Sequence, residues 1–177
     1  MSAPAARHAP SAGALLRRQF RLAHDLLDAA TDRLTIEAAH RRPPGAAAPA
    51  GACYAQVVLC EDLSVNGVLA ARSPLAHSTW LGRTGISELP PLAGSTDWRA
   101  WAHRVQLDLA VLRPYARAVY AATDAYLAAL PGEALDSESG EPPMCLLSAL
   151  LLTLAMRRGE ISCLAALDRP PAAGAPM

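Results

Sequence analysis

The chain contains no lysine, because all 16 of its basic residues are arginines. Without lysine, no side chain can form a Schiff base with a substrate carbonyl, and pyridoxal phosphate cannot be held by its usual imine. The chain also has a single phenylalanine, whereas alanine, arginine, proline and glycine are abundant. This bias is typical of GC-rich coding and indicates a high-GC bacterium as the source.

Several recurrent sites are also missing. The four cysteines form no CxxC pair, so neither a zinc ribbon nor a thioredoxin-type site is expected. The glycine-rich phosphate loops, the GxSxG elbow and the HExxH motif are absent. The formal net charge is zero, which is not the basic balance of a nucleic-acid-binding domain. We therefore expect no nucleic-acid partner.

Long hydrophobic runs are lacking as well. The longest, "MCLLSALLLTLAM", has about a dozen residues, whereas a helix needs about 20 to cross a bilayer. The N-terminus has no apolar segment like that of a signal peptide. We therefore expect a cytoplasmic protein with reduced thiols and no membrane partner.

What is present predicts one all-α domain. Hydrophobic residues make up 52% of the 177 residues and recur at helical spacing, and no segment alternates as a strand would. Residues 1–13 and 168–177 are rich in alanine and proline and are predicted to be disordered tails around a helical domain at 14–167. The helical blocks are residues 14–34, 53–71, 98–130 and 144–167.

The block boundaries carry further expectations. Thr35 is predicted to start a short extra turn, Asp97 to cap the third block, and Pro114 to kink or split that block. The connection at 72–96 is rich in glycine, proline, serine and threonine, and connections of this length usually bind or cover something. Four long helices predict an antiparallel four-helix bundle with its ligand site between facing helices.

Four segments occur in a suggestive order: "YAQVVLCEDLSVNGVL", "TWLGRTG", "YARAVYAATDAYLAAL" and "RRGEISCL". Through them the chain resembles the DinB/YfiT-like superfamily, especially its actinobacterial members, over roughly residues 14–167. The resemblance implies a four-helix bundle. It also implies a metal held by three histidines in many members, and thiol-dependent transferase or isomerase activity, with mycothiol or bacillithiol, in some.

The three positions that match those histidines carry other residues here. Gln56 stands at the ligand position of the second helix, and Thr153 and Arg157 stand at those of the last helix. An amide replaces a neutral imidazole poorly, and a guanidinium stays protonated. We therefore expect neither a metal nor any other cofactor.

The last helix places Thr153, Arg157 and Glu160 on one face. Arg157 and Glu160 are three residues apart and close enough to neutralise each other, which is one interpretation. In the other, Arg157 anchors a carboxylate, enolate or phenolate and stabilises developing negative charge. On that hypothesis Arg157 and Glu160 are catalytic, and Thr153 binds substrate.

Four more side chains complete the candidate site, each with a structural alternative. His24 is a general base, or else a hydrogen-bonded or surface histidine. Gln56 binds a ligand carbonyl, or else lines the core. Cys60 lines the pocket, although Cys60 and Cys53 are more typical of buried structural thiols. Trp80 is an apolar lid, or else a plug over the bundle end.

The sequence thus favours a metal-independent enzyme that acts on a small organic metabolite. The expected reaction is that of a cyclase or isomerase in a bacterial biosynthetic pathway, with the substrate held in the bundle cleft. Two alternatives stay open: a non-catalytic small-molecule binding or resistance protein, and a thiol-dependent, mycothiol-type S-transferase. The apolar helices also permit a homodimer.

Overall fold

The computed structural model describes residues 11–91, 97–131 and 142–167. Within these ranges the chain is all-α, as predicted, and its extended pairing is one isolated antiparallel bridge between Ile86 and Leu107. The predicted tails fall mostly outside the described residues. The helical elements are α1 (Ala12–Thr31), α2 (Ile36–His40), α3 (Ala50–Asp62), the π-helix η1 (Leu63–Leu69), the 3-10 turn η2 (Leu75–His77), α4 (Trp98–Arg104), α5 (Leu109–Ala129) and α6 (Pro142–Leu167).

Polar side chains at the N-termini explain where three helices begin. The Ser11 hydroxyl accepts a hydrogen bond from the backbone N–H of Ala14 and starts α1. The Thr35 hydroxyl accepts one from Ala38, so the predicted extra turn is confirmed as α2. The Asp108 carboxylate accepts one from Ala110 at 2.9 Å and starts α5. Each cap satisfies N–H groups that the first helical turn leaves without partners.

The third helical block is split, but not at Pro114. The break lies between α4 and α5, whereas Pro114 is accommodated inside α5. At the break, the backbone N–H of Asp108 donates to the carbonyl of Gly85 at 2.8 Å, which ties this point to the long connection. Gly85 has φ +75°, and a Cβ there would lie 2.5 Å from the Asp108 carbonyl oxygen. A distant segment, and not the proline, therefore sets this helix boundary.

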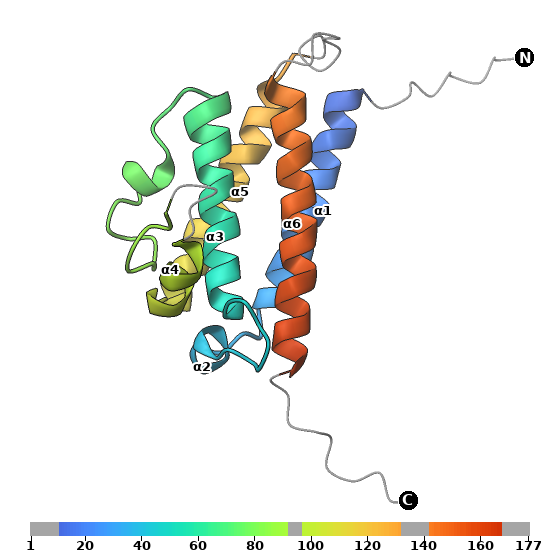
Figure 1. Ribbon diagram of the computed structural model, residues 1–177. Helices are drawn as coiled ribbons and strands as arrows, with labels where there is room; N and C mark the ends of the chain where they lie inside the picture. Colours follow the sequence, from blue (N-terminus) through green and yellow to red (C-terminus); the bar gives the residue numbers. More distant parts are fainter. Residues whose placement is uncertain (1–10, 92–96, 132–141, 168–177) are drawn as a thin grey trace, which may run out of the picture.

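The four long helices α1, α3, α5 and α6 run side by side (Figure 1). Helix α1 packs against α5 and α6, and α3 packs against the same two helices. The α1–α5 pair is antiparallel, because Arg17 near the start of α1 bonds Asp124 near the end of α5. Figure 1 shows α3 and α6 antiparallel too, whereas α1 and α6 run parallel, as do α3 and α5. The predicted antiparallel arrangement therefore holds for two of these four neighbouring pairs.

The long connection after α3 accounts for this topology. A short loop would return the chain antiparallel to the helix before it, whereas a long crossover lets the next helix run in the same direction. Residues 70–91 lead the chain away from the end of η1, and within them Gly85 lies beside Asp108 at the start of α5. Helix α5 consequently runs parallel to α3.

Helix α3 is the central helix, as its nearly uniform apolarity predicts. It contacts α2, α4, α5 and α6, and its residues Cys53, Tyr54 and Val58 are fully buried. Gly51 permits the close approach at its start, because a Cβ there would lie 2.6 Å from the Leu107 side chain. None of the helices in the described part of the chain combines the length and the apolarity that crossing a bilayer requires.

Candidate functional site

Two polar clusters lie on different sides of α3. The first, which we call the α3–α6 cluster, joins Cys53, Gln56 and Cys60 of α3 to residues of α6 and α4. The second, the buried network, joins α3 to α1 and α5. The remaining members of the α3–α6 cluster are Thr153, Arg157, Glu160 and Trp98.

Arg157 forms the centre of the α3–α6 cluster. Its Nη1 donates to Glu160 Oε2 at 2.5 Å, and the two side chains are 26% and 34% exposed. The guanidinium carbon lies 5.6 Å from the centroid of the Trp98 ring, within the range of a cation–π interaction. Arg157 is therefore a half-buried cation held between a carboxylate and an aromatic face.

The α3 side of the cluster is defined by two thiols. Burial, together with the charge of Glu160 and against the opposing charge of Arg157, raises the pKa of Cys53 to about 12. Burial also raises the pKa of Cys60, again against the charge of Arg157. Both thiols stay protonated at neutral pH, which favours the structural interpretation of these cysteines over thiolate chemistry.

Gln56 lies between those two cysteines on the same face of α3. Because Arg157 acts on both neighbours, Gln56 belongs to the surface of α3 that faces α6. Its Oε1 is buried and has no hydrogen-bond partner in the described structure. A buried amide oxygen without a partner costs about 1–3 kcal/mol, so it is a natural acceptor for a ligand donor.

Thr153 lies one helical turn before Arg157 on α6. Its hydroxyl donates to the carbonyl of Ala149 at 2.7 Å, a bond within the helix. The single hydroxyl proton is therefore used locally, and Thr153 can meet a ligand only as an acceptor.

The buried network has His24 at its centre and contains no member of the α3–α6 cluster. His24 Nε2 lies 2.9 and 3.1 Å from the two carboxylate oxygens of Glu61, and Thr123 Oγ1 donates to Glu61 Oε1 at 2.5 Å. The Tyr120 ring stacks on the His24 ring with centroids 4.0 Å apart. The His24 and Glu61 side chains are 7% and 1% exposed. His24 thus occupies the hydrogen-bonded core position that was the alternative to a pocket base.

A second buried carboxylate of α3, Asp62, fixes the long connection. Its oxygens accept from the backbone N–H groups of Leu75 and Ala76 at 2.9 and 2.8 Å, and from the Tyr115 hydroxyl at 2.7 Å. The Trp80 ring then packs on Tyr115, with centroids 5.6 Å apart. Trp80 is thereby placed against α5, and Trp98 is the tryptophan that contacts Arg157.

Three residues of these clusters were not candidates from the sequence. Glu61 had a visible signal, because it belongs to an acidic pair inside the apolar run "VVLCEDLSV". Thr123 had none, since its partner Glu61 lies 62 positions away. Trp98 packs against Trp101, with ring centroids 5.0 Å apart, and also contacts Arg157.

The positions that match the family's metal ligands do not fit a divalent cation. Arg157 brings a positive charge to this place, and Gln56 and Thr153 offer only neutral oxygens. In the described part of the chain, no three histidine, cysteine, aspartate or glutamate side chains group as metal ligands would. We therefore derive no step of the proposed chemistry from a metal at these positions.

Comparison with models of protein families, with curated proteins and with solved structures finds no match for this chain. The likeness to the DinB/YfiT-like superfamily stays a prediction from the motifs. What the structure itself shows is an all-helical chain with α1, α3, α5 and α6 packed together.

Proposed function

We propose that the chain binds a small organic anion or carbonyl compound at the α3–α6 cluster and acts on it without a metal. The proposed reaction is that of a cyclase or isomerase in a bacterial biosynthetic pathway. The observation that carries this is the state of Arg157, which is half-buried and spends one N–H group on Glu160 within the described residues. A guanidinium has five such donors in a planar fork, so most of its capacity is left for a ligand.

The surroundings of Arg157 favour a carboxylate, enolate or phenolate. The Trp98 ring holds the guanidinium on one side and also offers an apolar surface to the organic part of a ligand. A charge-assisted hydrogen bond to Arg157 is worth about 1.5–3 kcal/mol. A ligand anion therefore competes with the Glu160 carboxylate for the same cation.

This competition suggests a chemical role for each residue. In an isomerisation, Arg157 stabilises the negative oxygen of an enolate. Glu160, released from Arg157 by the ligand, takes a proton from the carbon next to the carbonyl and returns it to another carbon. The Gln56 amide meets a polar group on the substrate. His24, in the buried network, positions helices and takes no part in this step.

A non-catalytic binding or resistance protein would use the same site and differ only in turnover. The Arg157–Glu160 pair supports that alternative equally, since binding requires only that a ligand displace Glu160. The thiol-dependent S-transferase has less support, because metal activation of a thiol needs ligands that Gln56, Thr153 and Arg157 do not provide.

The test uses benzoate as a carboxylate probe and benzyl alcohol as its uncharged counterpart. Trp98 reports binding through its indole N–H resonance, which a Trp98→Phe variant identifies. We expect benzoate to shift this resonance saturably and benzyl alcohol to shift it much less. Arg157→Met roughly keeps the side-chain volume but removes the charge, and it should weaken benzoate binding by about tenfold or more. Arg157→Lys should keep only part of the benzoate affinity, because an ammonium group lacks the planar fork of a guanidinium.

Glu160 supplies the internal control. Glu160→Gln frees Arg157 from its carboxylate and should tighten benzoate binding, whereas Arg157→Met with Glu160→Gln should bind as weakly as Arg157→Met alone. If the double variant binds benzoate like the wild type, the pair is only self-neutralising and the proposed site is wrong. The absence of a saturable response in the wild type would contradict the proposal as well.

A further inference from the structure

The solvent side of α6 is unusually apolar. This helix has three charged residues: Arg157 and Glu160 belong to the α3–α6 cluster, and the exposed Arg158 lines the groove beside α1. On its outer side, Leu152 and Met156 are 62% and 65% exposed. A monomeric protein normally covers such a side with charged residues.

Helix α1 continues this apolar surface. Its side chains Leu15, Leu22 and Leu26 are 50%, 58% and 40% exposed. Helices α1 and α6 pack together, and Leu22 and Leu26 of α1 line a groove with Leu151 and Ala155 of α6. Leu152 and Met156 directly follow those two α6 residues in the sequence, so they belong to the same outer surface. We call the five exposed residues and this groove the α1–α6 face.

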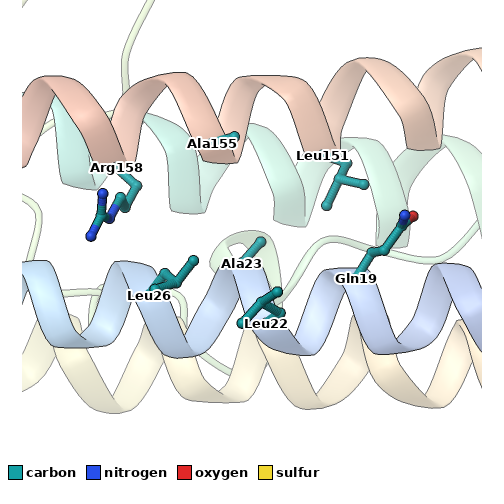
Figure 2. A pocket seen from close by; sticks show the side chains of 7 residues that line it. All are labelled: Gln19, Leu22, Ala23, Leu26, Leu151, Ala155 and Arg158. Atoms are coloured by element: carbon teal, nitrogen blue, oxygen red, sulfur yellow. The ribbon is translucent and has the colours of Figure 1, made fainter.

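The groove has a volume of about 330 Å³. Figure 2 shows Ala23 and Leu26 of α1 on the side towards α6, with Leu151 and Ala155 opposite them, while Leu22 lies over α1 itself at the edge of the groove. Arg158 marks one end of the groove. The groove is therefore lined mostly by apolar side chains, and an apolar ridge of complementary shape could fill it.

The size of the face fits a protein partner. A helix of 20 residues is about 30 Å long and about 10 Å wide, so two such helices side by side present a surface of roughly 600 Å². A stable interface buries about 800 Å² on each partner, of which this face would be the apolar centre. Exposed apolar patches of this size mark interaction sites in soluble proteins.

We propose that the α1–α6 face is the interface of a homodimer. The observation that selects a second copy is the charge pattern beside the leucines. Arg18 and Asp25 are exposed, lie seven residues apart along the same side of α1 and make no ion pair within the described residues. Their neighbours Arg17 and Arg21, in contrast, are both paired with Asp124.

This pattern is self-complementary. A two-fold axis that crosses α1 between residues 21 and 22 brings α1 against the α1 of the second copy in the opposite direction. Arg18 of each copy then faces Asp25 of the other, and Leu22 lies near the axis. Asp25 offsets Arg18 and Asp124 offsets Arg21, so Arg158 at the end of the groove is a single cation and not the basic cluster that would direct the face to an anionic lipid surface. This inference is independent of the function proposed for Arg157.

The experiment measures the mass of the full chain in solution by sedimentation equilibrium over a concentration series. We expect a dimer for the wild type. Leu22→Glu and Leu152→Glu each place a charge in the face, and each should weaken dimerisation by about tenfold or more. Val68→Glu is the matched control, because Val68 is 64% exposed on η1, outside the face, and this variant should remain dimeric. Circular dichroism verifies that each variant keeps its helices.

A charge exchange tests the proposed pairing. Arg18→Asp should weaken the dimer, and Arg18→Asp combined with Asp25→Arg should restore it. A monomeric wild type would overturn the proposal, as would a dimer that tolerates both Leu22→Glu and Leu152→Glu. Dissociation by Val68→Glu alone would place the interface on another surface and would equally contradict it.

Discussion

Two pairs of a basic side chain and a glutamate, His24–Glu61 and Arg157–Glu160, lie in very different surroundings in this molecule. His24 and Glu61 lie on separate helices, in the core, and Glu61 also accepts a hydrogen bond from Thr123. Arg157 and Glu160 lie three residues apart on one helix and are partly exposed. Together with Thr123, the first pair connects α1, α3 and α5, whereas the second pair connects two residues of the same helix, α6. The first therefore belongs to the fold, and the second is the pair that we propose opens for a ligand.

The largest effect is expected from breaking the buried pair. Glu61→Leu removes the acceptor of both His24 and Thr123 in the buried core, and losing one partner of a buried pair costs about 3–5 kcal/mol. Urea unfolding measures this as a fall in the free energy of unfolding. The matched control is His24→Leu with Glu61→Leu, which should recover much of the loss because no polar partner of the pair is left behind. A single variant as stable as the wild type would contradict the structural role of the pair.

The second largest effect is expected at Asp62, the carboxylate that follows Glu61 on α3. Both carboxylate oxygens of Asp62 accept hydrogen bonds, whereas Asp62→Asn turns one of them into an N–H donor that faces other donors. This should lower the free energy of unfolding by about 1–3 kcal/mol. It should also release the long connection, so that the backbone amides of Leu75 and Ala76 exchange hydrogen faster. Tyr115→Phe removes one of those donors and should cost less. Unchanged exchange in Asp62→Asn would show that Asp62 does not hold the connection.

Local patterns predicted much of this fold. The spacing of apolar residues predicted the long helices, and the uniform apolarity of "CYAQVVLC" predicted the central place of α3. Thr35 predicted the start of α2, and Met144 lies two residues inside the observed start of α6. These features depend on neighbours within a few turns, which is why the sequence alone reveals them.

Features set by distant residues could not be predicted in the same way. The break before α5 depends on a hydrogen bond from Asp108 to Gly85, and the place of His24 depends on Glu61, 37 positions away. The sequence grouped His24 and Trp80 with Arg157, whereas the structure places them with other partners. Arg157 and Glu160 form an ion pair and Arg157 acts on Cys60, while helical spacing assigns Thr153 to the Arg157 side of α6 and Gln56 to the Cys60 side of α3.

The smallest effect is expected at the partly exposed carboxylate of Asp124. Hydrogen bonds from Arg17 and Arg21 hold the pKa of Asp124 well below its usual range. A folded pKa below the unfolded value adds stability above about pH 4, and this stability is lost as the pH falls towards the folded pKa. Wild type should therefore lose more unfolding free energy than Asp124→Asn between pH 5 and the acid limit of the fold. Salt should shrink the difference, and parallel pH profiles for the two proteins would contradict this account.

The most direct test of the difference between the two pairs is a double-mutant cycle on each, measured by urea unfolding at neutral pH. One cycle combines His24→Leu with Glu61→Leu, and the other combines Arg157→Met with Glu160→Gln. The account predicts a coupling of about 2 kcal/mol or more for the buried pair. It predicts at most about 1 kcal/mol for the Arg157–Glu160 pair, which leaves Arg157 available to a ligand. Equal couplings, or the larger one at Arg157–Glu160, would make that pair part of the fold and contradict its role as a binding site.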